Sequence, residues 1–326
     1  MRRSGRKFNH YIKPMLATPA DKPFDSDEWL FELKLDGYRA IAELNKQKTL
    51  LYSRNGLDLS LAYPSITEEL KKIKMRAVID GEIVVLDKNG KPNFQELQNY
   101  TPESKLPIVY YVFDILSFDD HQLHDIPLIE RKKMLKKIIG KRRIVRYSDH
   151  ILHKGKSFFS QVKKDKLEGI MAKKKDSLYY PGTRTKEWLK IKYSRSQEAI
   201  IVGYTEPKGG RQHFGSLLLA EYKGNKLKYI GHTGTGFNEK SLKDLVMEMK
   251  KLVVDTSPLS PIPKANGPVT WIRPKLVCEI RFTEVTKDGS LRHPVYKGLR
   301  MDKESKSVKR ETEKEIPVQK LVHSYK

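Results

Sequence analysis

The sequence predicts an α+β protein with two domains, the second of them a small β-barrel. Up to about residue 195, short β-branched and aromatic runs alternate with tight-turn signals and amphipathic helical segments. From residue 196 to about residue 303, several short strand patterns surround one helical segment. A barrel of the OB type fits the second pattern. The first domain is expected to be built on mixed, mostly antiparallel sheets.

The first domain begins with strand patterns joined by tight turns. The expected strands are Trp29 to Leu35, Tyr38 to Leu44, Thr49 to Arg54 and Arg76 to Leu86. Asn55-Gly56 and the run Asp87 to Gly90 are turn signals, because Asn and Gly tolerate positive φ. Between these strands, Ile66 to Lys74 has the spacing of a helix.

A buried strand and a helix complete the pattern of the first domain. Leu106 to Phe113 is a nearly continuous apolar run, which predicts a strand buried on both faces. A helix is expected between Pro127 and Gly140, residues that suit a helix start and stop. Its apolar stripe comprises Leu128, Met134, Leu135, Ile138 and Ile139. The other face carries Arg131, Lys132, Lys133, Lys136 and Lys137. We expect it to be solvated, and contact with phosphates is the alternative.

The second domain is predicted to be mostly strand. The expected strands are Ala199 to Tyr204, Ser216 to Tyr222, Lys226 to His232 and, last, Leu276 to Glu284. A helix from Ser241 to Leu252 and a proline-rich loop up to Pro268 separate the third strand from the last. Cys278 shares a strand face with Ile280 and Phe282, which predicts a buried thiol. Residues 304–326 are expected to form a charged C-terminal tail.

Charge and composition narrow the class of protein. The 64 Lys and Arg residues exceed the 40 Asp and Glu residues and give a net charge of +24, which favours a polyanionic partner such as nucleic acid. We expect no membrane span, because no apolar run approaches roughly 18 residues. A single cysteine and the lack of a signal-peptide pattern favour a cytoplasmic location. That cysteine count also excludes a Cys-rich zinc site.

Five short segments carry the groups that chemistry on a nucleoside triphosphate needs. The first, Glu32 to Arg39, brings a lysine, a carboxylate, a glycine and an arginine to one strand junction. The other four are Ser53 to Gly56, Asp80 to Glu82, Leu167 to Lys173 and Trp188 to Lys192. Acids and cations at strand ends suit a triphosphate with a divalent metal.

This ordered set resembles the nucleotidyltransferase motifs of ATP-dependent DNA ligases, whose superfamily also contains mRNA capping enzymes and RNA ligases. The amino-acid sequence is most similar to the ligase module of bacterial and archaeal end-joining ligase-polymerase proteins of the LigD type. That similarity lies in Pro14 to Ala17, Tyr180 to Gly182, Gly234 to Phe237, Leu291 to Pro294 and Gly298 to Lys303. The resemblance covers about residues 14–303 and implies an adenylation domain followed by an OB-fold domain.

The resemblance implies a role for each motif residue. Lys34 would be the adenylate acceptor, and Asp36 and Glu168 would be ligands of Mg²⁺ or Mn²⁺. The ATP-binding residues would be Glu32, Leu35, Arg39, Arg54, Glu82, Phe113, Glu168, Lys190, Lys192, Arg300, Asp302 and Lys303. Among these, Leu35 and the backbone of Glu32 would border the adenine, and Phe113 would stack on it. The amine must be neutral to attack phosphorus, whereas an ordinary lysine with a pKa near ~10.4 is charged at pH 7. Burial and neighbouring cations such as Lys190 and Lys192 favour the neutral form.

The implied activity is ATP-dependent sealing of nicked or broken duplex DNA, in repair by end joining and alongside a Ku-like end-binding protein. Two alternatives remain open from the sequence. One is an RNA ligase or a capping-type guanylyltransferase of the same superfamily. The other is a basic nucleic-acid-binding scaffold without catalysis, although the motif residues named above are all present.

Overall fold

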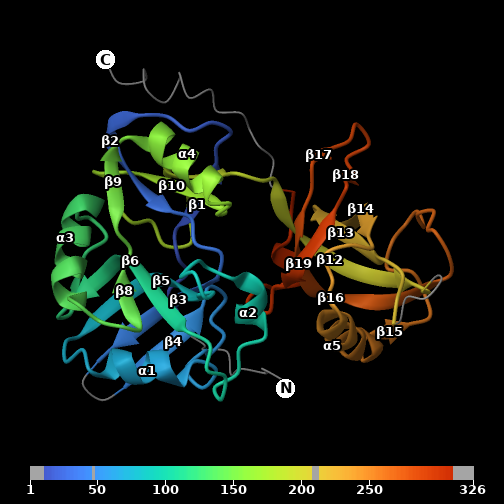
Figure 1. The fold of residues 1–326 in the computed structure, drawn as a ribbon, viewed down its shortest axis with the longest axis horizontal. Coiled ribbons are helices and arrows are strands. Elements are labelled where there is room, and N and C mark those ends of the chain that lie inside the picture. Colours follow the sequence, from blue (N-terminus) through green and yellow to red (C-terminus); the bar gives the residue numbers. More distant parts are fainter. Residues whose placement is uncertain (1–10, 46–47, 208–212, 311–326) are drawn as a thin grey trace. The chain divides into compact units, whose positions relative to one another are not determined.

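The computed structural model describes residues 11–45, 48–207 and 213–310, which divide into two compact units at Tyr193 and Ser194. Figure 1 shows both units, coloured along the chain. Each is held together by its own hydrophobic clusters. The predicted boundary at residue 195 lies within two residues of this division.

The first unit contains two β-sheets. The upper sheet in Figure 1 has the strand order β1-β11-β10-β2-β9. Its strands are β1 (Leu16–Pro19), β2 (Ser26–Leu33), β9 (His150–His153), β10 (Gly169–Lys174) and β11 (Arg184–Lys192). All its neighbours are antiparallel except β1 and β11, which run parallel.

The lower sheet has the order β4-β3-β5-β6-β7, with β8 paired to β6. Its strands are β3 (Tyr38–Leu44), β4 (Thr49–Ser53), β5 (Ala77–Val85), β6 (Ile108–Phe118), β7 (His121–Gln122) and β8 (Val145–Tyr147). The predicted strand that ended at Phe113 continues to Phe118, because Asp114 is buried within it rather than ending it.

Among the described residues, four helices cover the outer faces and one side of these sheets: α1 (Pro64–Lys71), α2 (Phe94–Gln98), α3 (Leu128–Ile139) and α4 (Gly155–Lys164). Pro64 occupies the first turn of α1, and the Asn93 side chain accepts a hydrogen bond from the Glu96 amide at the start of α2. Apolar side chains of α1, α2 and α3 pack on the outer face of the lower sheet, whereas α4 packs on the outer face of the upper sheet. The inner faces share a cluster that contains Leu30 and Trp188 from above and Ile41 and Tyr52 from below.

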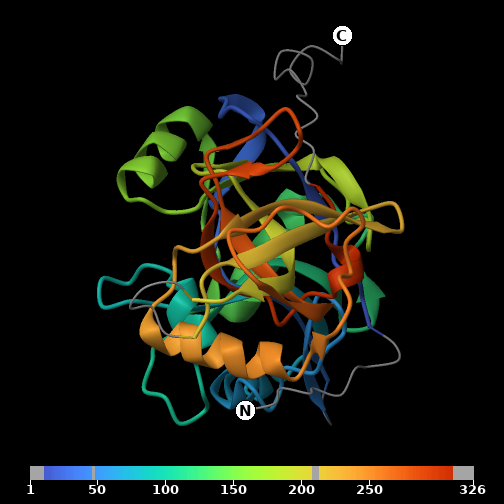
Figure 2. The same cartoon turned by 90° about the vertical axis from the view of Figure 1, so that its right-hand side faces the viewer.

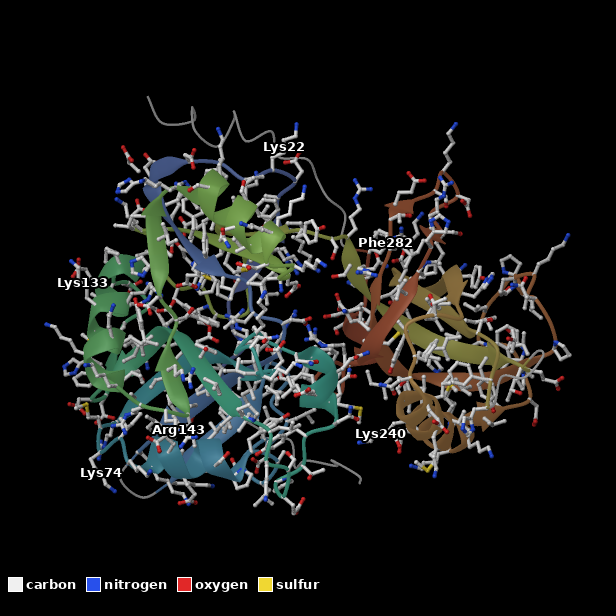
Figure 3. The ribbon with its side chains drawn as sticks, in the orientation of Figure 1. Lys22, Lys74, Lys133, Arg143, Lys240 and Phe282 are labelled. Carbon is white, nitrogen blue, oxygen red and sulfur yellow. The ribbon has the colours of Figure 1, made fainter. Side chains whose placement is uncertain are left out.

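The prediction of a solvated face on α3 is wrong for two of its five cations. The side chains of Arg131 and Lys132 are fully buried. Arg131 forms two hydrogen bonds with the carboxylate of Asp114, at 2.7 and 2.8 Å. Burial is tolerated here because each cation meets an acid on a neighbouring strand. Lys133 and Lys136 are exposed as expected, and Lys133 points outward from α3 in Figure 3.

The second unit is a curled antiparallel sheet of the OB type, in the order β14-β13-β12-β16-β15, with β19 also paired to β16. Its strands are β12 (Ser196–Thr205), β13 (Leu217–Lys223), β14 (Lys226–Thr233), β15 (Val253–Val254), β16 (Val269–Arg281) and β19 (Val295–Leu299). A separate hairpin pairs β17 (Glu284–Val285) with β18 (Leu291–Arg292). Figure 2 shows α5 (Glu239–Lys250) in orange beside this sheet. A capping box between Asn238 and Ser241 begins that helix.

Two details of the second unit differ from the sequence prediction, and one agrees. The strand that we expected to be the last is followed by β17, β18 and β19. Residues 304–310, predicted to begin the tail, pack on the sheet through a short 3₁₀ turn (Ser305–Ser307) and the buried Val308. The rest of the predicted tail, residues 311–326, lies outside the described residues. The buried thiol of Cys278 is confirmed, and burial raises the pKa of this thiol well above its usual range.

Candidate active site

The ends of three strands of the upper sheet meet at Lys34. Lys34 follows the last residue of β2, and its backbone amide donates to the carbonyl of Gly169 in β10, at 2.9 Å. On the other side of β10, Gly169 stands opposite Lys192 in β11. Antiparallel pairing therefore gathers residues that lie more than a hundred positions apart in the sequence.

The side chain of Lys34 forms an ion pair with Glu168. Its Nζ atom lies 2.7 Å from the carboxylate, to which it donates a hydrogen bond. Both side chains are only partly exposed, at 19% and 16%. The two most specific predicted residues, the acceptor lysine and an acid from a distant motif, are thus in direct contact.

Lys190 and Lys192 lie on the same face of β11, because side chains alternate along a strand. The residue between them, Ile191, and Leu189 point the other way, into the cluster under α4. Both lysines are half-buried. This alternation directs two cations to the inner side of the sheet, where the lower sheet faces them.

A tight loop carries the chain from Lys34 to the lower sheet. Gly37 lies so close to β5 that a Cβ atom here would stand 2.1 Å from the carbonyl oxygen of Ile83, so only glycine fits. Asp36 is half-buried in this loop, and Leu35 packs beside Val84 and Val109. Because the loop is pressed against β5, it fixes the position of Lys34 relative to both sheets.

The lower sheet contributes Arg39, Glu82 and Phe113 to the inner face. The Arg39 guanidinium binds both carboxylate oxygens of Asp80, at 2.9 and 2.6 Å, and lies 5.2 Å from the centroid of the Phe113 ring. Burial disfavours the charge of Arg39, but Asp80 outweighs it and raises the pKa of this group. The Tyr179 hydroxyl also donates to Asp80, at 2.7 Å. Glu82 is half-buried and pairs in register with Arg39.

Beneath these groups lies a buried ion cluster that the sequence analysis did not predict. Glu32 is 2% exposed, and its two carboxylate oxygens contact Lys132 from α3 and Lys173 from β10. The Lys173 ammonium lies 4.2 Å from the ring centroid of Phe113 and 4.1 Å from that of Trp188. Burial disfavours ionisation of Glu32, but the two lysines outweigh it and lower its pKa. Burial lowers the pKa of Lys173.

Four of the predicted residues belong to other segments of the chain. Arg54 is half-buried in the turn after β4. Arg300, Asp302 and Lys303 belong to the second unit, after β19. There the Arg300 guanidinium binds both oxygens of Asp302, at 2.9 and 2.8 Å, and Lys303 pairs with Glu198 at 2.6 Å. The last predicted motif is thus ordered by ion pairs within its own unit.

The donors available for a metal ion are few. No group of three or more His, Cys, Asp or Glu side chains in the described parts of the chain has the arrangement of a metal site. Glu168 and Asp36, the two predicted ligands, offer carboxylate oxygens, which are the donors that Mg²⁺ and Mn²⁺ prefer. Two carboxylates suit a cation that also binds phosphate oxygens, rather than one held by protein alone.

Two family descriptions match this chain. The "ATP dependent DNA ligase domain" matches residues 14–192, and the "ATP dependent DNA ligase C terminal region" matches residues 210–303. The chain belongs to the ATP-dependent DNA ligase family. This finding confirms the family prediction, and it favours a DNA ligase over the RNA ligase and capping alternatives.

Several members of this ligase family are close relatives. The multifunctional non-homologous end joining protein LigD of Pseudomonas aeruginosa is 37% identical over 307 residues, which cover 91% of this chain and 36% of that protein. LigD of Mycolicibacterium smegmatis is 36% identical over 295 residues, which cover 89% of this chain and 38% of that protein. The chain therefore spans little more than a third of the length of these relatives.

A solved structure of a mycobacterial DNA ligase D, complexed with ATP and MES, is also similar. It is 33% identical, with a TM-score of 0.68, and the match covers 92% of this chain and 98% of that chain. The predicted fold class, an adenylation domain followed by an OB-type domain, is confirmed for this chain. Among the described residues, no helix has the length and apolar character that a membrane crossing requires.

Proposed function

We propose that this chain joins DNA strands through a covalent lysyl-AMP on Lys34. The observation that carries the proposal is the contact between the Lys34 amine and the carboxylate of Glu168, which lie 2.7 Å apart where three strand ends meet. Lys192 lies at the end of β11, the strand that pairs with β10. Nucleotidyl transfer requires a partly buried lysine with an acid and further cations around it.

The reaction has three phosphoryl transfers. The Lys34 Nζ attacks the α-phosphorus of ATP, a phosphorus–nitrogen bond forms, and pyrophosphate leaves with the electron pair of the broken bond. A 5′-phosphate oxygen of the DNA then attacks the same phosphorus, and the lysine amine leaves. Finally the adjacent 3′-hydroxyl attacks the 5′-phosphorus, loses its proton and expels AMP. Positioning and charge stabilisation dominate such transfers, so no strong general base is needed.

The Lys34 amine must lose its proton before it attacks. In the structure the amine donates a hydrogen bond to a carboxylate oxygen 2.7 Å away, so it is directed at Glu168 and not at a phosphorus atom. Glu168 must therefore release Lys34 when ATP is bound. Oxygen donors from Glu168 and Asp36 fit Mg²⁺ or Mn²⁺, and a bound cation would neutralise charge on the phosphates. Lys190 and Lys192 then contact the α-phosphate.

Further predicted residues hold the rest of the nucleotide. Phe113 stacks on the adenine, which Leu35 and the backbone of Glu32 border. The ribose or the reacting strand is held by Arg39, Arg54 and Glu82. The domain boundaries follow the same proposal: residues 1–195 form the adenylation domain and 196–303 the OB-fold domain, whose Arg300, Asp302 and Lys303 orient the leaving pyrophosphate.

The proposed setting is repair of DNA breaks by end joining, with related uses in recombination and replication. Support comes from the LigD relatives, whose names describe non-homologous end joining. The substrate is a nicked or broken duplex, to which a net charge of +24 is complementary. A Ku-like end-binding protein is the proposed partner, and the nucleoid in the cytoplasm is the proposed location.

Labelling with α-³²P nucleotides tests this function. We expect a covalent label from ATP and none from GTP, and transfer of that label to a nicked DNA duplex but not to single-stranded RNA. A label from GTP alone would support a guanylyltransferase instead. A protein that binds DNA but takes label from neither nucleotide would be the inactive scaffold.

A further inference from the structure

The side chains of the buried cluster, Glu32, Lys132 and Lys173, take no direct part in the proposed chemistry. The Lys132 side chain is fully buried, and the Glu32 and Lys173 side chains are each 2% exposed. Lys132 and Lys173 each contact one oxygen of the same carboxylate. Two positive charges against one negative charge are costly in a protein interior. Stability alone therefore does not explain why these three charged residues are buried together.

The cluster connects the two sheets of the first unit. Glu32 and Lys173 lie on β2 and β10 of the upper sheet, whereas α3, which carries Lys132, packs Leu135 and Ile139 into the core on the lower sheet. Lys132 also donates to the carbonyl of Ser148, which follows β8 of the lower sheet, at 3.1 Å. Figure 1 shows α3 alongside both sheets.

Further bonds attach the start of α3 to the upper sheet. The Leu128 amide donates to the Ser177 carbonyl at 3.0 Å, and the Ile129 amide donates to the Lys175 carbonyl at 2.9 Å, both just beyond β10. Helix α3 is therefore held at its first turn by the backbone and, one turn later, by Lys132. Lys132 is the side chain of α3 that reaches Glu32, only two residues before Lys34.

This connection matters because the candidate active site is divided between the same two sheets. Lys34, Glu168, Lys190 and Lys192 belong to the upper sheet or its loops, whereas Arg39, Glu82 and Phe113 belong to the lower one. A change in the spacing or the angle of the sheets would move the amine relative to the groups that hold the nucleotide. Displacement of a reacting group by about 1 Å is enough to slow a reaction about a hundredfold.

We propose that Lys132 is a positioning residue for nucleotidyl transfer. Through Glu32 it holds β2, which ends just before Lys34, in a fixed position relative to the lower sheet. This inference rests on the proposed function. Within the described residues, the Lys132 ammonium contacts Glu32, the carbonyl of Ser148 and the ring of Tyr147, and of these only Glu32 is a predicted nucleotide contact. Its loss should therefore lower the maximal rate of lysyl-AMP formation more than it changes the ATP concentration at half-saturation.

The charge of the cluster makes Lys132→Met the informative variant. It leaves Glu32 and Lys173 as a one-to-one pair at 2.7 Å, so no uncompensated charge is created. Lys133→Met is the matched control, because Lys133 is the next residue of α3 and is 63% exposed. Lys132→Arg restores the positive charge, and Lys132→Gln retains a donor toward Glu32.

The experiment measures single-turnover adenylation of the full chain over a range of ATP concentrations, at least 15 °C below each variant's thermal unfolding midpoint. We expect Lys132→Met to lower the maximal rate tenfold or more, with less than a threefold change in half-saturating ATP. We expect Lys132→Arg to recover part of this loss and Lys133→Met to equal the wild type. If Lys132→Met does not fold, Lys132→Gln decides by the same criterion.

A maximal rate within twofold of the wild type in the folded variant would overturn the inference and leave Lys132 a purely structural residue. Failure of the wild-type protein to take AMP from ATP at all would instead overturn the proposed function. The two failures are therefore distinguishable in one set of assays.

Discussion

The Nζ atom of Lys34 lies 2.7 Å from the carboxylate of Glu168, although 134 residues separate them in the sequence. This contact joins the first and the fourth of the five chemical segments and defines the candidate active site. It also sets a requirement for catalysis, because the amine that donates to this carboxylate must turn away from it, with a free electron pair, before it can attack phosphorus.

The first prediction concerns the amine itself. Lys34→Ala should abolish lysyl-AMP formation and nick sealing, a loss of at least about a thousandfold, because no nucleophile remains. DNA binding should change little, since one charge of many is lost. Intact-mass measurement after incubation with ATP should show the added mass of AMP on the wild type and none on the variant. Lys133→Ala serves as the control, and sealing at the normal rate by Lys34→Ala would disprove the mechanism.

The second prediction concerns Glu168. Glu168→Gln retains the shape of the side chain but not its charge, so it should weaken metal binding and slow adenylation about a hundredfold. Titration with Mg²⁺ and Mn²⁺ should show half-activation at a higher metal concentration than in the wild type. Glu187→Gln, a change of another half-buried glutamate on β11, is the control. An unchanged metal requirement would remove Glu168 from the proposed ligands.

The motif residues were expected at strand ends, and this holds for some of them. Lys34 and Glu168 lie just beyond strand ends, and antiparallel pairing brings those ends to one edge. The residues Arg39 and Lys190, in contrast, lie within strands rather than at their ends. The pattern that identified the motifs did not contain their position along each strand.

Arg131 and Lys132 show where the sequence-based prediction failed. A charged residue is normally assigned to solvent because its isolated burial is costly. Their partners, Asp114 and Glu32, lie 17 and 100 residues away in the sequence, so no local sequence pattern identifies these partners. A signal was nevertheless present: Leu128, Arg131, Lys132, Leu135 and Ile139 follow the spacing of one helix face. Cations at core-facing positions predict buried acids on neighbouring elements.

The third prediction concerns the pH dependence of stability in the second unit. Burial disfavours the charge of Asp302, but Arg300 outweighs it, so the pKa of Asp302 is lowered from its ordinary 3.8. A lowered carboxyl pKa stabilises the fold above pH 3.8, and this contribution is lost as the pH falls through the folded-state pKa. Asp302→Asn should therefore cost about 3 kcal/mol near pH 7, and the difference should begin to shrink as the pH falls below 3.8.

Urea unfolding of the full chain from pH 7 to pH 3 measures this difference. The expected cost is at the lower end of the range for a broken buried pair, because Glu279 still lies 3.8 Å from Arg300. Asp244→Asn, an exposed change on α5, should alter stability by less than about 0.5 kcal/mol at every pH. A cost for Asp302→Asn that stays constant down to pH 3 would exclude the ion pair as its origin.

The last prediction concerns salt. A net charge of +24 favours contacts with DNA phosphates, each of which releases condensed counterions on binding. If the chain makes about six to ten such contacts, its affinity for a nicked duplex should fall about 10³- to 10⁵-fold between 50 and 200 mM salt. Fluorescence anisotropy with a labelled duplex measures this slope. Covalent AMP formation without DNA should respond far less to the same salt, because it depends on a partly buried contact rather than on exposed charges. Equal salt sensitivity of the two steps would show that ionic strength acts on the adenylation site itself and not on the DNA interface.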